Sequence, residues 1–124
     1  MPQDAKSGAK ANEYGHETSR LIAEKIGAIS VSDRSNEFAH EGRLITIRCA
    51  KENNEQVGVL YSMLDRVDSV IAAFEIEKKL SNLYEMTPSL YKIFMRDSKD
   101  EGRIGLVHKK KFMDAGKILS TVTL

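Results

Sequence analysis

Apolar residues near the N-terminal end of the chain recur every three or four positions. The stripe consists of Tyr14, Thr18, Leu21, Ile22 and Ile26. This spacing places side chains on one face of an α-helix, and the Gly27 that follows is a common helix terminator. The pattern therefore predicts a helix from about Glu13 to Ile26. Residues 1–12 carry no such periodicity, and we expect them to form a disordered lead.

The next segment has the pattern of a β-hairpin. Two short β candidates, at residues 29–31 and 36–40, precede a turn at Glu41-Gly42 and a longer run at residues 44–50. Side chains alternate between the two faces of a strand, so residues 45, 47 and 49 are predicted to share one face. Residues 44, 46 and 48 then share the other, and this second face carries the polar groups, Thr46 and Arg48.

A helix and a buried strand are predicted after this hairpin. A polar loop at residues 51–56 leads into apolar positions at 59, 60, 63, 64 and 67, which have helical spacing. Ser69–Phe74 is a continuous apolar segment bounded by charge, typical of a strand buried on both faces. Two strands joined by a helix in this way are predicted to be parallel, with a right-handed crossover.

The C-terminal part adds further strands and helices. Thr87 and Pro88 are a helix N-cap and a first helical residue, and the helix they open carries the apolar residues of 90–94. A loop is predicted at 97–103, a short helix at 109–115, and strands at 82–86, 104–108 and 118–124. The whole pattern predicts an α/β fold with a mixed central sheet flanked by helices and C-terminal strand-helix additions.

Length and composition fit one globular domain. The chain has 124 residues, of which 41% are hydrophobic and 30% charged. No apolar run approaches the length of a membrane span, and the first ten residues lack the apolar stretch of a secretory signal, so we expect a cytoplasmic protein. Cys49 is the single cysteine, which excludes an internal disulfide, and its apolar neighbours favour a packing role.

Charge is balanced overall but uneven along the chain. The net charge is +1, from 19 basic and 18 acidic residues. Residues 96–124 hold seven basic and four acidic residues, whereas residues 13–95 hold ten and thirteen. A basic end of this kind is compatible with contact to a polyanion, and also with an ordinary solvated surface.

The order of predicted elements over residues 13–75 resembles the PD-(D/E)xK nuclease superfamily, whose restriction-endonuclease-like fold has an αβββαβ core. The resemblance implies one such domain over residues 13–124. In that superfamily an acid on the second strand and an acid-x-lysine triplet on the third hold Mg²⁺ for phosphodiester hydrolysis, often with a glutamate from the first helix. On this chain the helix glutamate corresponds to Glu17, the second-strand acid to Glu37 or Asp33, and the triplet to Thr46-Ile47-Arg48.

The triplet departs from the family pattern. Mg²⁺ prefers carboxylate oxygens, and Thr46 supplies a hydroxyl without the neutralising charge. A lysine of lowered pKa can transfer a proton. Arg48 stays protonated, so it could bind a phosphate but could not act as a proton acceptor. Lys51, three residues further on, could take the place of the missing lysine.

Three functions follow from these residues and from the resemblance. The first is a DNA-binding or accessory protein of a nuclease system, with little or no hydrolysis of its own. Its phosphate contacts are predicted at Arg48, Lys51, Lys109, Lys110 and Lys111. Since family members usually pair on palindromic sites, the resemblance also implies a homodimer.

The two alternatives separate by chemistry. An active Mg²⁺-dependent DNA endonuclease would use Glu17, Asp33 and Glu37 as metal ligands, with Lys51 as the catalytic lysine. A protein-interaction module would keep only the fold, which the near-zero net charge permits.

Overall fold

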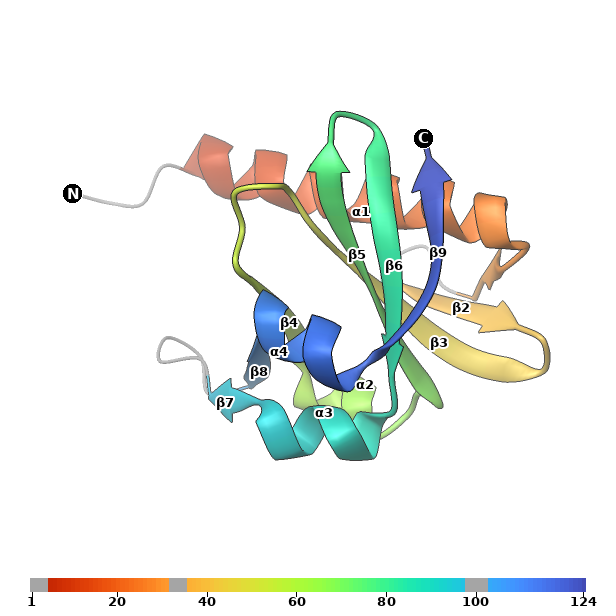
Figure 1. The fold of residues 1–124 in the computed structure, drawn as a ribbon, viewed down its shortest axis with the longest axis vertical. Helices are drawn as coiled ribbons and strands as arrows, with labels where there is room; N and C mark the ends of the chain where they lie inside the picture. Colours follow the sequence, from red (N-terminus) through yellow and green to blue (C-terminus); the bar gives the residue numbers. More distant parts are fainter. Residues whose placement is uncertain (1–4, 32–35, 98–102) are drawn as a thin grey trace.

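The protein is an α/β fold built on a mixed six-stranded sheet, sheet A, and a smaller three-stranded sheet, sheet B (Figure 1). The computed structural model describes residues 5–31, 36–97 and 103–124, with only the backbone described for residues 5–14. Sheet A has the strand order β1-β2-β3-β5-β6-β9 and sheet B the order β4-β8-β7. The strands of sheet A are β1 (Ile29–Ser30), β2 (Glu37–His40), β3 (Arg43–Ala50), β5 (Ser69–Glu77), β6 (Leu80–Met86) and β9 (Lys117–Thr123).

Helix α1 (Ala5–Ile26) covers one face of sheet A and confirms the predicted N-terminal helix. It begins eight residues before the predicted start at Glu13, inside the segment that we expected to be disordered. Residues 5–12 are rich in alanine and lysine, which favour a helix intrinsically even where no apolar stripe marks one. Apolar periodicity reports the buried face of a helix and therefore does not detect such an extension.

The predicted hairpin is present as β2 and β3, joined by a two-residue turn. Glu41 and Gly42 both have positive φ angles, 51° and 76°. Two successive left-handed residues give the turn type whose twist matches that of paired strands. The turn fixes a register in which Glu37 lies opposite Thr46 and Phe38 opposite Ile45.

The pairing of β3 with β5 confirms that these two strands are parallel, but the connection between them differs from the prediction. Residues 59–67 were expected to be a helix; instead β4 (Gln56–Leu60) pairs with β8 (Ile104–His108), and only Tyr61–Leu64 forms helix α2. Val57 and Val59 are buried with period two, while Met63, Leu64 and Val67 continue an apolar pattern that also fits a helix. The strand assignment depends on β8, which lies more than forty residues away in the sequence.

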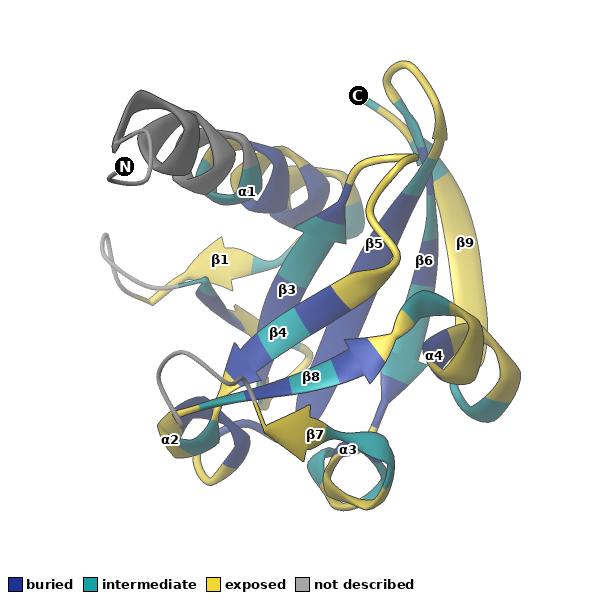
Figure 2. Cartoon of the chain, turned by 90° about the vertical axis from the view of Figure 1, so that its left-hand side faces the viewer, coloured by how far each residue is buried: buried dark blue, intermediate teal, exposed yellow. Residues whose placement is uncertain are grey.

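Sheet B and three short helices cover the face of sheet A opposite α1 (Figure 2). Strand β7 (Arg96–Asp97) completes sheet B, and helices α3 (Pro88–Phe94) and α4 (Lys109–Ala115) flank it. The Thr87 side chain accepts a hydrogen bond from the Leu90 amide, which confirms the predicted cap. Only the ends of the predicted loop at 97–103 lie within the described residues.

Sheet A separates two hydrophobic cores. Between α1 and sheet A lie Ile22, Phe38, Ile45, Ile47, Ile71 and Leu83, all nearly inaccessible to solvent. On the other face, Val70, Ala72 and Phe74 of β5 pack against Tyr91 of α3 and Phe112 of α4. The rings of Phe74 and Phe112 meet edge to face with their centroids 5.8 Å apart. Among the described helices, none is both long and apolar enough to cross a membrane.

Tyr91 ties α3 to sheet B through its hydroxyl, which leads to a stability prediction. The buried hydroxyl donates to the Gly105 carbonyl oxygen at 2.7 Å and lies 3.2 Å from that of Val57. Tyr91→Phe removes the donor and keeps the ring, so we expect the free energy of unfolding in urea to fall by about 1–2 kcal/mol. Tyr84→Phe is the matched control, because the Tyr84 hydroxyl bonds to no described residue; equal stability of the two variants would contradict the assignment.

Candidate functional site

Three polar residues to which the resemblance assigns motif positions, Glu37, Thr46 and Arg48, lie on one face of sheet A. Glu37 of β2 is the register partner of Thr46 of β3, and Arg48 is two residues further along the same strand. All three are on the face that packs against sheet B, which we call the inner face, because Val70 and Ala72, the β5 partners of Thr46 and Arg48, belong to that core. The shared face that strand alternation predicts for Thr46 and Arg48 is therefore confirmed, and the register of β2 places Glu37 on the same face.

Glu37 is neutralised by an arginine that sequence reasoning did not single out. Its side chain is buried, and Arg66 Nη2, just after α2, donates to Glu37 Oε1 at 2.6 Å. The hydrogen bond and the charge of Glu37 raise the pKa of the Arg66 guanidinium above its usual value. The positive charge of Arg66 balances the negative charge of the Glu37 carboxylate, and one of the two carboxylate oxygens already accepts a hydrogen bond.

Thr46 and Arg48 are polar groups in an apolar setting. Thr46 is fully buried, and within the described part of the chain its hydroxyl has no hydrogen-bond partner. Arg48 is partly buried beside Tyr91 and forms no ion pair or hydrogen bond with any described residue. Burial lowers the pKa of its guanidinium, although an arginine remains charged at any ordinary pH.

The remaining predicted metal ligands do not join Glu37 in the described structure. Glu17 is exposed on α1, which packs against the opposite face of sheet A, and Asp33 lies outside the described residues. Lys51 is exposed one residue beyond the end of β3 and has an interaction of its own.

The donor set on the inner face does not fit Mg²⁺. Within residues 5–31, 36–97 and 103–124, no group of three or more His, Cys, Asp or Glu side chains is arranged to hold a metal ion. The hydroxyl of Thr46 offers no charge, and the carboxylate of Glu37 is engaged by Arg66. Of Glu37, Thr46 and Arg48, only Glu37 carries the carboxylate that a hard cation prefers, and that carboxylate is paired with Arg66.

The three predicted lysines lie together on the opposite side of the molecule from α1. Lys109, Lys110 and Lys111 form the first turn of α4, which follows β8 directly. Lys109 Nζ lies 5.7 Å from the centroid of the Phe74 ring, and Lys111 Nζ lies 5.8 Å from that of Phe94. Lys110 is exposed. The aromatic faces hold two of the ammonium groups close to the protein surface.

The chain between Pro88 and Lys117, which forms α3, β7, β8 and α4, is basic. We call these elements the basic layer. Residues 88–117 hold eight lysines and arginines and four acidic residues, a net charge of +4, so the rest of the chain carries −3. Five of these basic residues and two of the acidic ones lie in the four elements of the basic layer. Part of this charge is paired: Lys92 Nζ lies 2.9 Å from Asp65 Oδ1, and Arg96 donates to the Gln56 side chain.

Cys49 has the packing role that its apolar neighbours indicate. Its thiol faces α1, 3.4 Å from the Ser19 hydroxyl, which also bonds to the Ile47 carbonyl oxygen at 2.9 Å. Burial raises the pKa of the Cys49 thiol to about 11, so the nucleophilic thiolate is scarce at neutral pH.

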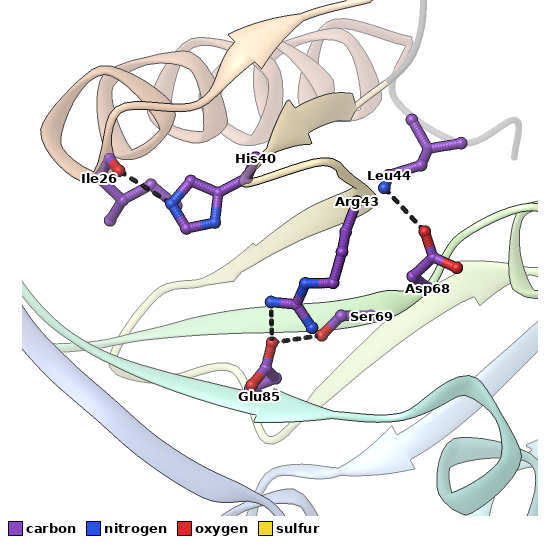
Figure 3. Close-up of polar contacts among 7 residues, drawn as sticks. All are labelled: Ile26, His40, Arg43, Leu44, Asp68, Ser69 and Glu85. Carbon is purple, nitrogen blue, oxygen red and sulfur yellow. Dashed lines mark hydrogen bonds and ion pairs between the residues drawn. The ribbon is translucent and has the colours of Figure 1, made fainter.

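A second polar cluster lies on the α1 face of sheet A (Figure 3), and no pattern in the sequence indicated it. Arg43 Nη2 and Ser69 Oγ both donate to Glu85 Oε2, at 3.1 and 2.7 Å, while His40 Nε2 bonds to the Ile26 carbonyl oxygen at 3.0 Å. These residues come from four different strands and the end of α1. No local spacing signals such a cluster, because only the sheet order brings its members together.

The roles of these residues are inferred from their geometry alone. The sequence matches none of the protein-family models and none of the curated proteins with which it was compared.

The raised pKa of Cys49 leads to a prediction about pH. In the folded chain the thiolate fraction at pH 8 should be about a hundredfold lower than for a thiol with the ordinary pKa of 9.0. Iodoacetamide should therefore alkylate Cys49 far more slowly in the folded protein than in urea. The pKa of Cys49 is higher in the folded state than in the unfolded state, so the protonated thiol favours the folded state. This contribution of Cys49 to the free energy of unfolding is complete below about pH 9 and is lost as the pH rises toward 11. Equal alkylation rates in the folded and unfolded protein would contradict this.

Proposed function

We propose that this protein is a DNA-binding domain built on a degenerate restriction-endonuclease-like fold, with no hydrolytic activity of its own. The sheet order supports the proposal: β1, β2 and β3 pair antiparallel in succession and β5 adds to β3 in parallel, after a first helix. This order is compatible with the αβββαβ core that the resemblance implies. The short α2 and the added β4 are departures from it.

The observation that carries the proposal is the state of the three residues at the position of the nuclease motif. Glu37 is bound to Arg66, Thr46 stands where an acid is needed, and Arg48 stands where a lysine is needed. Hydrolysis at neutral pH needs a metal-bound water or a general base, and these residues offer neither. The fold would therefore serve as a scaffold rather than as a catalyst.

DNA is favoured as the partner by the charge of the basic layer. Residues 88–117 carry a net charge of +4 in a chain that is otherwise acidic, and α4 presents three successive lysines. Lysines placed on a surface can neutralise backbone phosphates and release counterions. Contact to the backbone alone carries no base preference, so we expect binding with little dependence on DNA sequence.

Arg48 and Lys51 fit this mode of binding less directly than the lysines of α4. Arg48 is partly buried under sheet B, away from the surface that a duplex could reach. A homodimer and a protein partner within a nuclease system stay predictions.

The salt dependence of DNA binding tests the proposal. The double variant Lys110→Ala/Lys111→Ala should bind a short duplex more weakly and reduce the slope of log K against log[salt] by about 1.8, since each lost phosphate contact contributes about 0.9. Lys25→Ala/Lys78→Ala removes the same charge from α1 and from the turn after β5, and it should behave like the unmodified protein. Absent binding, or equal slopes for the two variants, would contradict the proposal and favour a protein-interaction module.

A nicking experiment tests the absence of hydrolysis separately. Supercoiled plasmid incubated with the protein and Mg²⁺ or Mn²⁺ should remain supercoiled, because the residues of the inner face that the structure describes form no metal-binding donor set. Metal-dependent nicking that disappears in Glu37→Ala would establish the active endonuclease instead. Nicking that persists in that variant would point to a contaminating nuclease, and further purification should then remove it.

A further inference from the structure

The polar cluster on the α1 face of sheet A lines a cavity of about 390 Å³, large enough for a small organic molecule. The cavity lies between the end of α1, the β2–β3 hairpin and the strands β5, β6 and β9 (Figure 3). Ile26, Ile71 and Leu119 give it apolar walls, and His40, Arg43 and Glu85 supply polar groups. It is on the other side of sheet A from Glu37 and the basic layer.

The Nδ1 atom of His40 is a hydrogen-bond acceptor to which no described residue donates. Its Nε2 is within hydrogen-bond distance of the Ile26 carbonyl oxygen, which can only accept, so Nε2 carries the proton and Nδ1 of the neutral ring has a free lone pair. Nδ1 is buried and has no partner within the described residues. In Figure 3 it lies on the side of the ring that faces Arg43 and Glu85. A buried acceptor left in this state is costly, and a donor entering from the cavity would satisfy it.

Glu85 offers a second acceptor in the same cavity. Arg43 and Ser69 both donate to its Oε2, and no hydrogen bond from a described residue reaches Oε1. The cavity lining includes two carboxylates, Glu41 and Glu85, and one guanidinium, Arg43, so its formal charge is −1 with neutral His40. Two free acceptors, a surplus negative charge and apolar walls are complementary to a cationic donor attached to an apolar body.

We propose that this cavity binds a small amphipathic ammonium ligand, whose N–H groups donate to Glu85 and His40 and whose apolar part packs against Ile26 and Leu119. Leu119 is 41% exposed, which a ligand in the cavity would reduce. This proposal does not depend on DNA binding, because the cavity shares no residue with the basic layer.

Titration with benzylammonium, followed by methyl NMR of the full chain, tests the proposal. The methyl signals of Ile26 and Leu119 should shift in a saturable way, and binding of benzyl alcohol, which has the same ring and no charge, should be at least tenfold weaker. Benzoate should not bind. Preferred binding of benzoate would overturn the proposal in favour of an anion site at Arg43, and no saturable shift with any probe would show that the cavity holds solvent only.

Two variants locate the binding. Glu85→Gln should weaken benzylammonium binding at least tenfold, because it removes the charge that the ammonium faces. Glu77→Gln, an equivalent change on an exposed position of β5, should leave binding unchanged. If Glu85→Gln fails to fold, Ser120→Phe fills the cavity from β9 and should abolish binding, with Thr123→Phe on the same strand as its control. Binding unaffected by the folded cavity variants would overturn the proposal.

Discussion

The parallel pairing of β3 with β5 is the contact on which the rest of the structure depends. Six successive residue pairs, from Ile45 opposite Ser69 to Ala50 opposite Phe74, join the two strands. Every residue of Ser69–Phe74 is buried, so both faces of this pair must be covered. The α1 helix covers one face and sheet B the other, which explains why a chain of this length has two cores separated by one sheet.

The same pairing decides the surroundings of Thr46 and Arg48. It places Thr46 and Arg48 against Val70 and Ala72, inside the core beneath sheet B. A carboxylate in such a setting needs a partner, and Arg66 supplies one to Glu37 at the end of α2. Burial therefore decides the surroundings of Thr46, and pairing with Arg66 decides those of Glu37.

The basic layer and the cavity at His40 and Glu85 lie on opposite sides of sheet A. The basic layer offers positive charge on exposed helices and short strands, where a large polyanion can approach. The cavity at His40 and Glu85 is smaller, carries a negative charge, and lies on the α1 face near the edge strand β9. Sheet A, whose central strands are buried, separates them, so each surface can act without the other.

The sequence by itself determined the elements whose signals are local. The α1 stripe, the Glu41-Gly42 turn, the buried run of β5, and the Thr87-Pro88 cap each depend on residues that are neighbours in the chain. The shared face of Thr46 and Arg48 followed from strand alternation alone, whereas the partner of Glu37 did not. Tertiary structure decided that residues 56–60 form a strand, that Arg66 reaches Glu37, and that His40 and Glu85 border one cavity. Those outcomes depend on contacts between residues far apart in the chain, which carry no periodicity or spacing that a single sequence can reveal.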